Sequence, residues 1–287
     1  MSTAIQGIVL GLLASAVWAV ANVFIQVASR SGGPLRTLLW GQFLGAGLMV
    51  PALLLWPVTT MPEQPVWLLV GALSSALAYY GLFRAFEGGP VSVGSPVIAG
   101  WALVTTVLGM VLFDERLTLV QGAGALLVVG GGVSIAALAD AGTGEWLEPR
   151  ARVLTWAVGS SLGFGVMVAA MQPLAHSLGP VGSLLALWGG QWLILVPVTV
   201  WRHRDSSLLP PREVWPAVVA FGLLETVGFL AVDVGTLLAP VSLVAPPASL
   251  GSLATVFLGR IWLGEEVGRA RIGLAAVVVL GVILLGS

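Results

Sequence analysis

Cysteine and lysine are absent from this chain of 287 residues, and charged residues of either sign are scarce. Without cysteine the chain can form no disulfide, no thiolate nucleophile and no cysteine-ligated zinc site. Its two histidines, His176 and His203, lack the spacing of a metal-binding pair, so we expect no metal and no cofactor. Charged residues make up 9% of the chain, compared with about a quarter in a soluble domain. These shortages exclude a water-soluble enzyme, a disordered chain and a nucleic-acid binder with a basic face.

Apolar residues dominate instead: 57% of the chain is hydrophobic, and the mean hydropathy is +1.01. A helix that crosses the roughly 30 Å hydrocarbon core of a bilayer needs about 20 apolar residues. Long apolar runs without strict alternation predict helices and not the strands of a membrane barrel. We therefore predict an all-α, multi-pass protein of the lipid bilayer with ten transmembrane helices. They cover residues 4–28, 35–57, 65–86, 91–113, 118–138, 152–175, 181–201, 213–236, 241–263 and 269–286.

The second half of the chain repeats part of the first. Residues 90–133 align without a gap with residues 240–283 at a constant shift of 150 positions. Each half then holds five helices, and an odd number places the second half upside down in the membrane. Inverted repeats are typical of alternating-access carriers, whose substrate binds near the bilayer midplane. We predict one repeat in residues 1–138, a connecting loop in 139–151 and a second repeat in 152–287. The most specific identities are Pro90/Pro240, Ser92/Ser242, Pro96/Pro246 and Glu115/Glu265, and a weaker match at a shift of 146 includes Ser15/Ser161.

Two short turns carry a family resemblance. The sequences Asp114-Glu115-Arg116-Leu117 and Gly264-Glu265-Glu266-Val267 each precede the last helix of a half. With two five-helix halves, the chain resembles the drug/metabolite transporter (DMT) superfamily and, within it, the EamA-type ten-helix branch, which includes bacterial exporters of aromatic amino acids. The resemblance implies the DMT fold, secondary active transport and the bacterial cytoplasmic (inner) membrane. We expect Glu115 and Glu265 to be structural, either capping the last helix of each half or pairing with a nearby arginine.

The arginines are distributed unequally between the two sides of the predicted bundle. Eleven lie in or beside the odd-numbered loops, and Arg116 lies on the opposite side. The positive-inside rule then places both termini outside the cytoplasm. The family resemblance implies the reverse, with both termini inside, so the sequence leaves two orientations open.

Glu225 is the strongest candidate for a functional residue, because it lies near the centre of the predicted eighth helix. A carboxylate at this depth costs about 2.5–3.5 kcal/mol on insertion scales, so it should face a cavity or a partner. We interpret it as a proton-coupling site or as the counter-ion of a substrate ammonium group. A protonated carboxyl that bonds one helix to another is the structural alternative. Asp233 lies nearer the helix end, and we expect it to be a solvated residue of the vestibule.

Polar and aromatic residues at mid-membrane depth are the other candidates for substrate contact. In the first helix, Ser15, Trp18, Asn22 and Gln26 recur at helical spacing and form one stripe. A single asparagine usually joins helices, but four such residues in line favour a cavity wall. Aromatic rings add stacking and cation–π contacts to a flat or cationic molecule. The predicted substrate-binding residues are Trp18, Asn22, Gln26, Tyr79, Tyr80, Trp101, Trp188 and Glu225.

Other spacings indicate packing. Arg84 and Glu87 are three residues apart and are expected to pair along their helix. Glycines four residues apart allow helices to approach closely. We interpret them as internal packing, although the same spacing suits a dimer, so we expect a monomer or a homodimer. The pairs are Gly7/Gly11, Gly41/Gly45 and Gly159/Gly163.

The function that these features favour is secondary active transport of a small organic metabolite. We predict an exporter of aromatic or other apolar amino acids, with protons as a coupling ion through Glu225. The alternative substrate is a quaternary-ammonium or choline-like cation, which a carboxylate among aromatic rings would suit equally well. The alternative of another class is an intramembrane enzyme on a lipid-linked substrate, which lacks an obvious catalytic set here. No nucleic-acid partner is expected.

Overall fold

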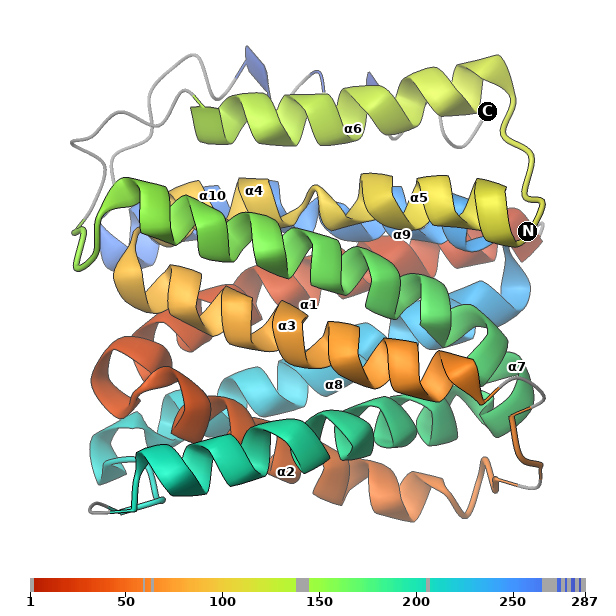
Figure 1. Cartoon of the computed structure of the whole chain (residues 1–287). Helices are drawn as coiled ribbons and strands as arrows, with labels where there is room; N and C mark the ends of the chain where they lie inside the picture. Colours follow the sequence, from red (N-terminus) through yellow and green to blue (C-terminus); the bar gives the residue numbers. More distant parts are fainter. Residues whose placement is uncertain are drawn as a thin grey trace.

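The computed structural model describes residues 3–58, 60–62, 65–137, 145–204 and 207–264, together with isolated positions between 273 and 284. Within these residues every regular element is a helix, and the long helices run side by side in one bundle (Figure 1). This observation confirms the all-α prediction. The helices are α1 (Thr3–Gly32), α2 (Pro34–Ala52), α3 (Val66–Gly88), α4 (Val91–Ile98), α5 (Trp101–Leu112), α6 (Leu119–Ala137), α7 (Arg150–Arg202), the short 3-10 helix η1 (Arg212–Val214), α8 (Trp215–Leu238), α9 (Val241–Ser249) and α10 (Gly251–Leu263).

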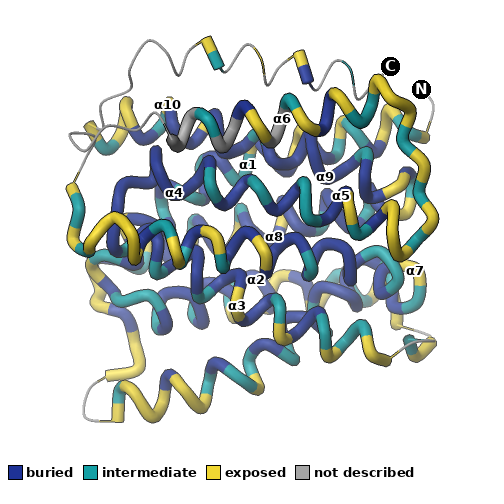
Figure 2. Tube along the Cα trace, turned by 45° about the horizontal axis from the view of Figure 1, so that its top comes forward, coloured by how far each residue is buried: buried dark blue, intermediate teal, exposed yellow. Residues whose placement is uncertain are grey.

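The bundle carries apolar side chains on its outside as well as in its core. Leu69, Val111 and Leu193 are 63%, 70% and 80% exposed, whereas buried residues follow the inner faces of the helices (Figure 2). Among the described residues, six helical stretches are long and apolar enough to cross a membrane, counting α4 with α5, η1 with α8, and α9 with α10. Nine of the ten predicted stretches overlap described helices, although α2 ends at Ala52, five residues before the predicted end of 35–57. The tenth, residues 269–286, lies outside the described residues apart from isolated positions, so the count of ten helices stays a prediction.

Two predicted helices are each divided by a bend. The stretch 91–113 is divided at Ala99–Gly100 into α4 and α5, and the stretch 241–263 is divided at Leu250 into α9 and α10. Proline has no N–H to donate and its ring crowds the preceding turn, so a helix bends beside it. Pro96 lies inside α4 and Pro246 inside α9, and at both bends the backbone closes tighter, three-residue hydrogen bonds. The shared prolines of the predicted repeat thus produce a bend at matching places.

The helix α7 contains a reversal. The sequence predicts two separate helices here, at 152–175 and 181–201. The structure has a single run of 53 residues that is helical except at Gly179. Its φ of 71° lies in the left-handed region, where a side chain is strained and glycine is not. Pro180 follows and can begin the next helix, because the first turn of a helix needs no donor from it. The two predicted helices are therefore present, joined with almost no loop (Figure 1).

Glycines let several helices touch backbone to backbone. A Cβ on Gly11 would lie 2.6 Å from the carbonyl oxygen of Val244, and one on Gly163 would lie 2.6 Å from the amide nitrogen of Ala78. Two glycines of α2 face α8: a Cβ on Gly45 would lie 2.9 Å from the carbonyl oxygen of Gly222, and one on Gly41 would lie 2.1 Å from the ring of Phe221. Internal packing is confirmed for these glycines, whereas Gly159 has only a loose neighbour at 3.7 Å.

Glu115 caps a helix of the other half. Its two carboxyl oxygens accept hydrogen bonds from the backbone N–H groups of Val241 at 2.9 Å and Ser242 at 3.0 Å, at the start of α9. Free N–H groups and the helix dipole make a helix N-terminus favourable for a carboxylate. The structural role is as predicted, but the expected target, the last helix of the same half, is wrong. Glu265 lies outside the described residues.

Candidate functional site

A central cavity lies among α1, α3, α7, α8 and the two bends. It consists of two adjoining hollows of about 60 and 40 Å³ that share part of their walls. The shared wall contains Trp18, Asn22, Leu82, Ile98 and Trp101. The first hollow is completed by Phe164, Val168, Glu225 and Phe229, and the second by residues at the α4/α5 and α9/α10 bends, among them Ser95, Ser249 and Ser252.

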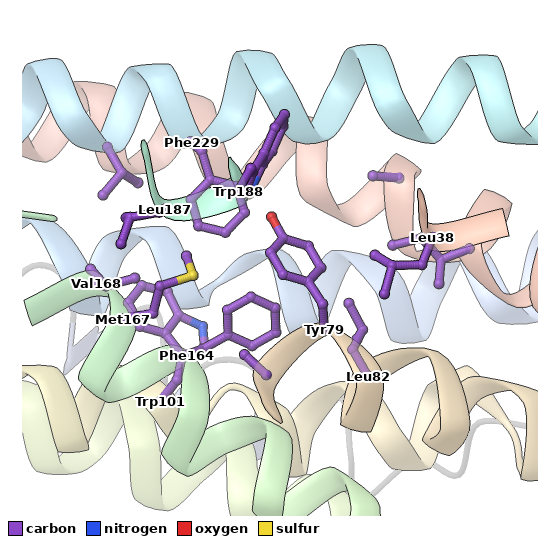
Figure 3. Packing of buried hydrophobic residues seen from close by; sticks show 14 of the residues in the cluster. Leu38, Tyr79, Leu82, Trp101, Phe164, Met167, Val168, Leu187, Trp188 and Phe229 are labelled. Atoms are coloured by element: carbon purple, nitrogen blue, oxygen red, sulfur yellow. The ribbon is translucent and has the colours of Figure 1, made fainter. Parts of the chain in front are cut away.

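Aromatic rings form most of the cavity wall. The ring centroids of Trp18 and Phe229 are 4.7 Å apart, and those of Trp18 and Trp101 are 6.0 Å apart. Phe164 stacks on Phe229 at 6.1 Å and meets the edge of Tyr79 at 5.1 Å. Figure 3 shows the rings of Tyr79, Trp101, Phe164 and Phe229 converging from different helices. Such a wall suits a flat or apolar ligand, because aromatic pairs favour edge and offset contacts.

Glu225 supplies the charge of this cavity. The α8 helix places its carboxyl against the wall with 5% of the residue exposed. The hydroxyl of Tyr79 donates a hydrogen bond to Glu225 Oε2 at 3.3 Å. Among the described residues that line the two hollows, no basic side chain occurs. A ligand in this cavity therefore meets one carboxyl and no cation, an arrangement that favours an ammonium group.

Two donors on α1 face the same space. Asn22 Nδ2 donates to the hydroxyl of Thr255 at 3.1 Å and so ties α1 to α10. The indole N–H of Trp18 is buried and has no hydrogen-bond partner within the described part of the chain. An unmet buried donor is costly, so a ligand that brings an acceptor to Trp18 would gain a hydrogen bond.

The position of the Trp18 ring depends on Gly228. A Cβ at position 228 would lie 2.3 Å from Trp18 Nε1, which is shorter than a van der Waals contact allows. We expect Gly228→Ala to displace the indole and to weaken ligand binding about tenfold, or about 1.4 kcal/mol. The measurement is ligand-induced thermal stabilisation of the purified protein. Gly189→Ala is the matched control, since a Cβ there meets nothing within 4 Å. Equal ligand responses in the two variants would refute this role of the ring.

The remaining predicted residues lie behind or outside the cavity. Trp188 is fully buried behind Tyr79, at a centroid distance of 6.5 Å. Gln26 uses its amide to bond the carbonyl oxygen of Gly89 at 3.1 Å. Tyr80 packs against Trp156 and lines a separate hollow near Arg84. Of the eight residues predicted to bind substrate, the structure places Trp18, Asn22, Trp101 and Glu225 in the cavity wall. It places Tyr79 and Trp188 just behind the wall, and Gln26 and Tyr80 away from it. Sequence reasoning missed the apolar wall residues, which are Leu82, Ile98, Phe164, Val168 and Phe229.

Ion pairs at one end of the bundle join α1 and α3 to the segment before α7. This arginine-rich end carries Arg30, Arg36, Arg84 and Arg202. Arg84 bonds to Glu87, which confirms the predicted pair, and to Glu148 at 2.6 Å. Arg30 meets Glu145 at 3.6 Å. The residues between these two glutamates cross the end of α3, where the N–H groups of residues 147 and 148 donate to the carbonyl oxygen of Gly88. The described part of the predicted connecting loop is thus attached to both α1 and α3.

His203 lies at the same end, beyond the last residue of α7. Burial together with the positive charges of Arg36 and Arg202 lowers the pKa of this histidine below its usual value. It is therefore neutral at physiological pH and adds no charge to the arginines around it. No group of three metal-ligating side chains occurs among the described residues.

Asp233 does not lie in a vestibule, and that prediction is wrong. The residue is completely buried, and its Oδ2 accepts a hydrogen bond from the hydroxyl of Ser183 at 2.6 Å. Ser183 belongs to the part of α7 that follows the reversal at Gly179. The sequence gives depth along a helix but not the direction in which a side chain points, and α7 covers this face of α8.

Comparison with known proteins gives two findings. The model of the EamA-like transporter family matches residues 5–137 and again residues 151–287. A solved structure described only as "Crystal structure of protein" resembles this one with a TM-score of 0.72, covering 97% of this chain and 95% of its own. At 20% sequence identity, that likeness shows a shared fold alone. No curated protein matches the chain.

Proposed function

This chain belongs to the EamA-like transporter family, and on that premise we propose that it is a secondary carrier whose substrate binds in the central cavity. It is a multi-pass membrane transporter of small molecules. The direction that we propose is export, by alternating access about the cavity, in the bacterial inner membrane. Family membership also makes the intramembrane enzyme unlikely.

The proposed substrates are aromatic or other apolar amino acids. The observation that carries this proposal is an aromatic cavity in which Glu225 is the one charged residue among the described residues of the wall. The carboxylate would hold the substrate ammonium, and the rings of Trp18, Trp101 and Phe229 would hold its side chain. The unmet indole N–H of Trp18 would donate to the substrate carboxylate.

A second candidate substrate is a quaternary-ammonium or choline-like cation. The described cavity wall has no basic side chain. This favours a permanent cation, which carries no carboxylate that would need a basic side chain as its partner. An aromatic cage with one carboxylate is a common solution for such ligands. The two candidates differ in whether a negative group on the ligand strengthens or weakens binding.

Alternating access would use the two halves of the chain. The two family matches, the proline bends at equivalent places and the shift of 150 positions all support a pair of repeats. Both bends line the cavity, so a change in bend angle would open the cavity to one side and close it to the other. An inverted relation of the halves would make the two openings equivalent.

The test is a thermal-shift panel on the purified protein in detergent. It compares tryptophan, phenylalanine, leucine, the matching decarboxylated amines and choline. A ligand that binds the folded state at a hundred times its Kd stabilises the protein by about 2.7 kcal/mol. Stabilisation by the amino acids above that by their amines supports the amino-acid proposal. Stabilisation by amines and choline alone would replace it with the cation carrier, and no response to any of them would refute both.

A further inference from the structure

Asp233 is the second of two carboxylic acids buried within the described part of the chain, the first being Glu225. It lies eight residues beyond Glu225, about 12 Å further along α8. It does not line the central cavity. Its Oδ2 is bonded to Ser183, while its Oδ1 is buried without a hydrogen-bond partner within the described residues. A carboxylate would leave the lone pairs of Oδ1 unsatisfied, whereas a proton on this group removes the charge from a fully buried position.

The position equivalent to Asp233 in the first half carries no carboxyl. The shift of 150 positions that carries α3 onto α8 places Phe83 at Asp233, and the acid of α3, Glu87, lies one turn further on. Glu87 is a quarter exposed and paired with Arg84. Asp233 is fully buried and forms no such pair with an arginine within the described residues, so a partner that would hold it as an anion is missing.

No other element packed against α8 supplies that partner. The elements packed against α8 are α1, α2, α7, α9 and η1, and the charged residues of η1, Arg212 and Glu213, precede the start of α8, far from Asp233. The charged residues of α1 and α2 are Arg30 and Arg36, at the arginine-rich end, and α9 has none. The helix α7 carries Arg150, Arg152 and Arg202 at that same end and His176 beside its reversal, where His176 is exposed. Glu115 caps the start of α9. No ion pair to Asp233 forms within the described residues.

We propose that Asp233 binds the proton that is exchanged in the transport cycle, at a site separate from the substrate cavity. The inference rests on the proposed carrier function. In the conformation described here the carboxyl keeps its proton because protein surrounds it. When α7 moves away from α8, water reaches the group, the O–H bond breaks, the proton passes to water and the carboxylate is hydrated. A hollow of about 510 Å³ beside the α7 reversal, lined in part by Pro173, His176 and Ser177, lies at the end from which water would arrive.

This arrangement divides two tasks between two acids. Glu225 faces the substrate and would hold its ammonium group. Asp233 would keep or release its proton according to whether water reaches it from one end of the bundle. Binding of substrate and binding of the proton are then separable by mutation. A single shared acid would make them inseparable.

The test uses Asp233→Asn in proteoliposomes, with the panel ligand that stabilises the wild type best. We expect the variant to keep its ligand-induced thermal shift within about twofold in Kd and to keep exchange at equal pH on both sides. Accumulation driven by a pH gradient is expected to fall at least tenfold. Glu87→Gln, a carboxyl-to-amide change at the partly exposed acid of α3 that pairs with Arg84, should keep its response to the gradient. A normal gradient response in Asp233→Asn would overturn the proposal.

Two further measurements cover a variant that fails to fold and a failure of the substrate assignment. Ser183→Ala removes the one hydrogen bond to the carboxyl, so it should change the pH midpoint of transport and leave ligand affinity intact. Infrared spectra of the purified protein against pH report the C=O stretch of a buried protonated carboxyl without any substrate. The band should shift in Ser183→Ala and disappear in Asp233→Asn. If these bands behave so while no panel ligand binds, the proposed substrates are wrong and the proton site stands; if the band ignores both variants, the proton site is wrong.

Discussion

Glu225→Gln is expected to weaken ligand binding by at least tenfold without unfolding the protein. Glutamine has nearly the same shape and its amide oxygen can still accept the hydrogen bond from Tyr79. It removes the one charge of the cavity wall, so a ligand ammonium loses a charge-assisted hydrogen bond, worth about 1.5–3 kcal/mol. We expect Kd to rise about 10- to 150-fold and transport to fall accordingly. The measurement is ligand-induced thermal shift followed by uptake into proteoliposomes.

The control for this prediction is the same substitution at an exposed position. Glu213 lies in η1 on the surface, and Glu213→Gln should bind as the wild type does. The unliganded Tm of Glu225→Gln should not fall, because burying a neutral amide costs less than burying a carboxylate. Wild-type affinity in Glu225→Gln would show that the acid only joins helices, as the structural alternative holds.

Gly222→Ala is expected to cause the largest loss of stability among single methyl additions. The new Cβ would lie 2.3 Å from the carbonyl oxygen of Gly41 and 3.0 Å from its carbonyl carbon. These are backbone atoms of α2, so no side chain can turn aside and the two helices must separate. Overpacking of this kind costs about 1–3 kcal/mol, and we expect the upper part of this range. At about 2–4 °C for each kcal/mol, the Tm in detergent should fall by roughly 5–10 °C.

A second glycine-to-alanine change separates crowding from helix propensity. Gly189 lies within α7, and a Cβ there meets nothing within 4 Å. Alanine favours a helix interior over glycine by about 1 kcal/mol, so Gly189→Ala should keep or raise the Tm. If both variants unfold at the same temperature, the contact between α2 and α8 is looser than the structure describes.

The positions of the helices along the chain could be predicted from the runs of apolar residues. Their bends, and the directions in which their side chains point, could not. Hydrophobic length fixed nine of the stretches, and glycine spacing predicted which surfaces pack closely. The bends within 91–113 and 241–263 could not be predicted from the sequence, because a proline produces such a division only where the neighbouring turns also tighten. Asp233 was misplaced for a related reason. Its depth follows from counting residues, but its burial depends on α7, which no local pattern connects to α8.

The cavity was predicted where its wall is polar. Trp18, Asn22 and Glu225 stand out in apolar helices, whereas Phe164 and Phe229 look like any core residue. Tyr79 and Tyr80 show the limit of reading positions without faces. Neighbouring residues point about 100° apart on a helix, so only one of the two could approach the cavity, and it is Tyr79 that bonds to Glu225.

The small size of the central cavity has a kinetic consequence. Its hollows of about 60 and 40 Å³ are far below the roughly 300–1,000 Å³ of sites that hold small organic ligands. A substrate can therefore enter only a wider conformer. Its observed Kd then equals the Kd for that conformer divided by the fraction of molecules that adopt it. The association rate should level off as substrate concentration rises, at the frequency with which the bundle opens. Substitutions that favour the wider form would then speed association without touching any residue of the wall.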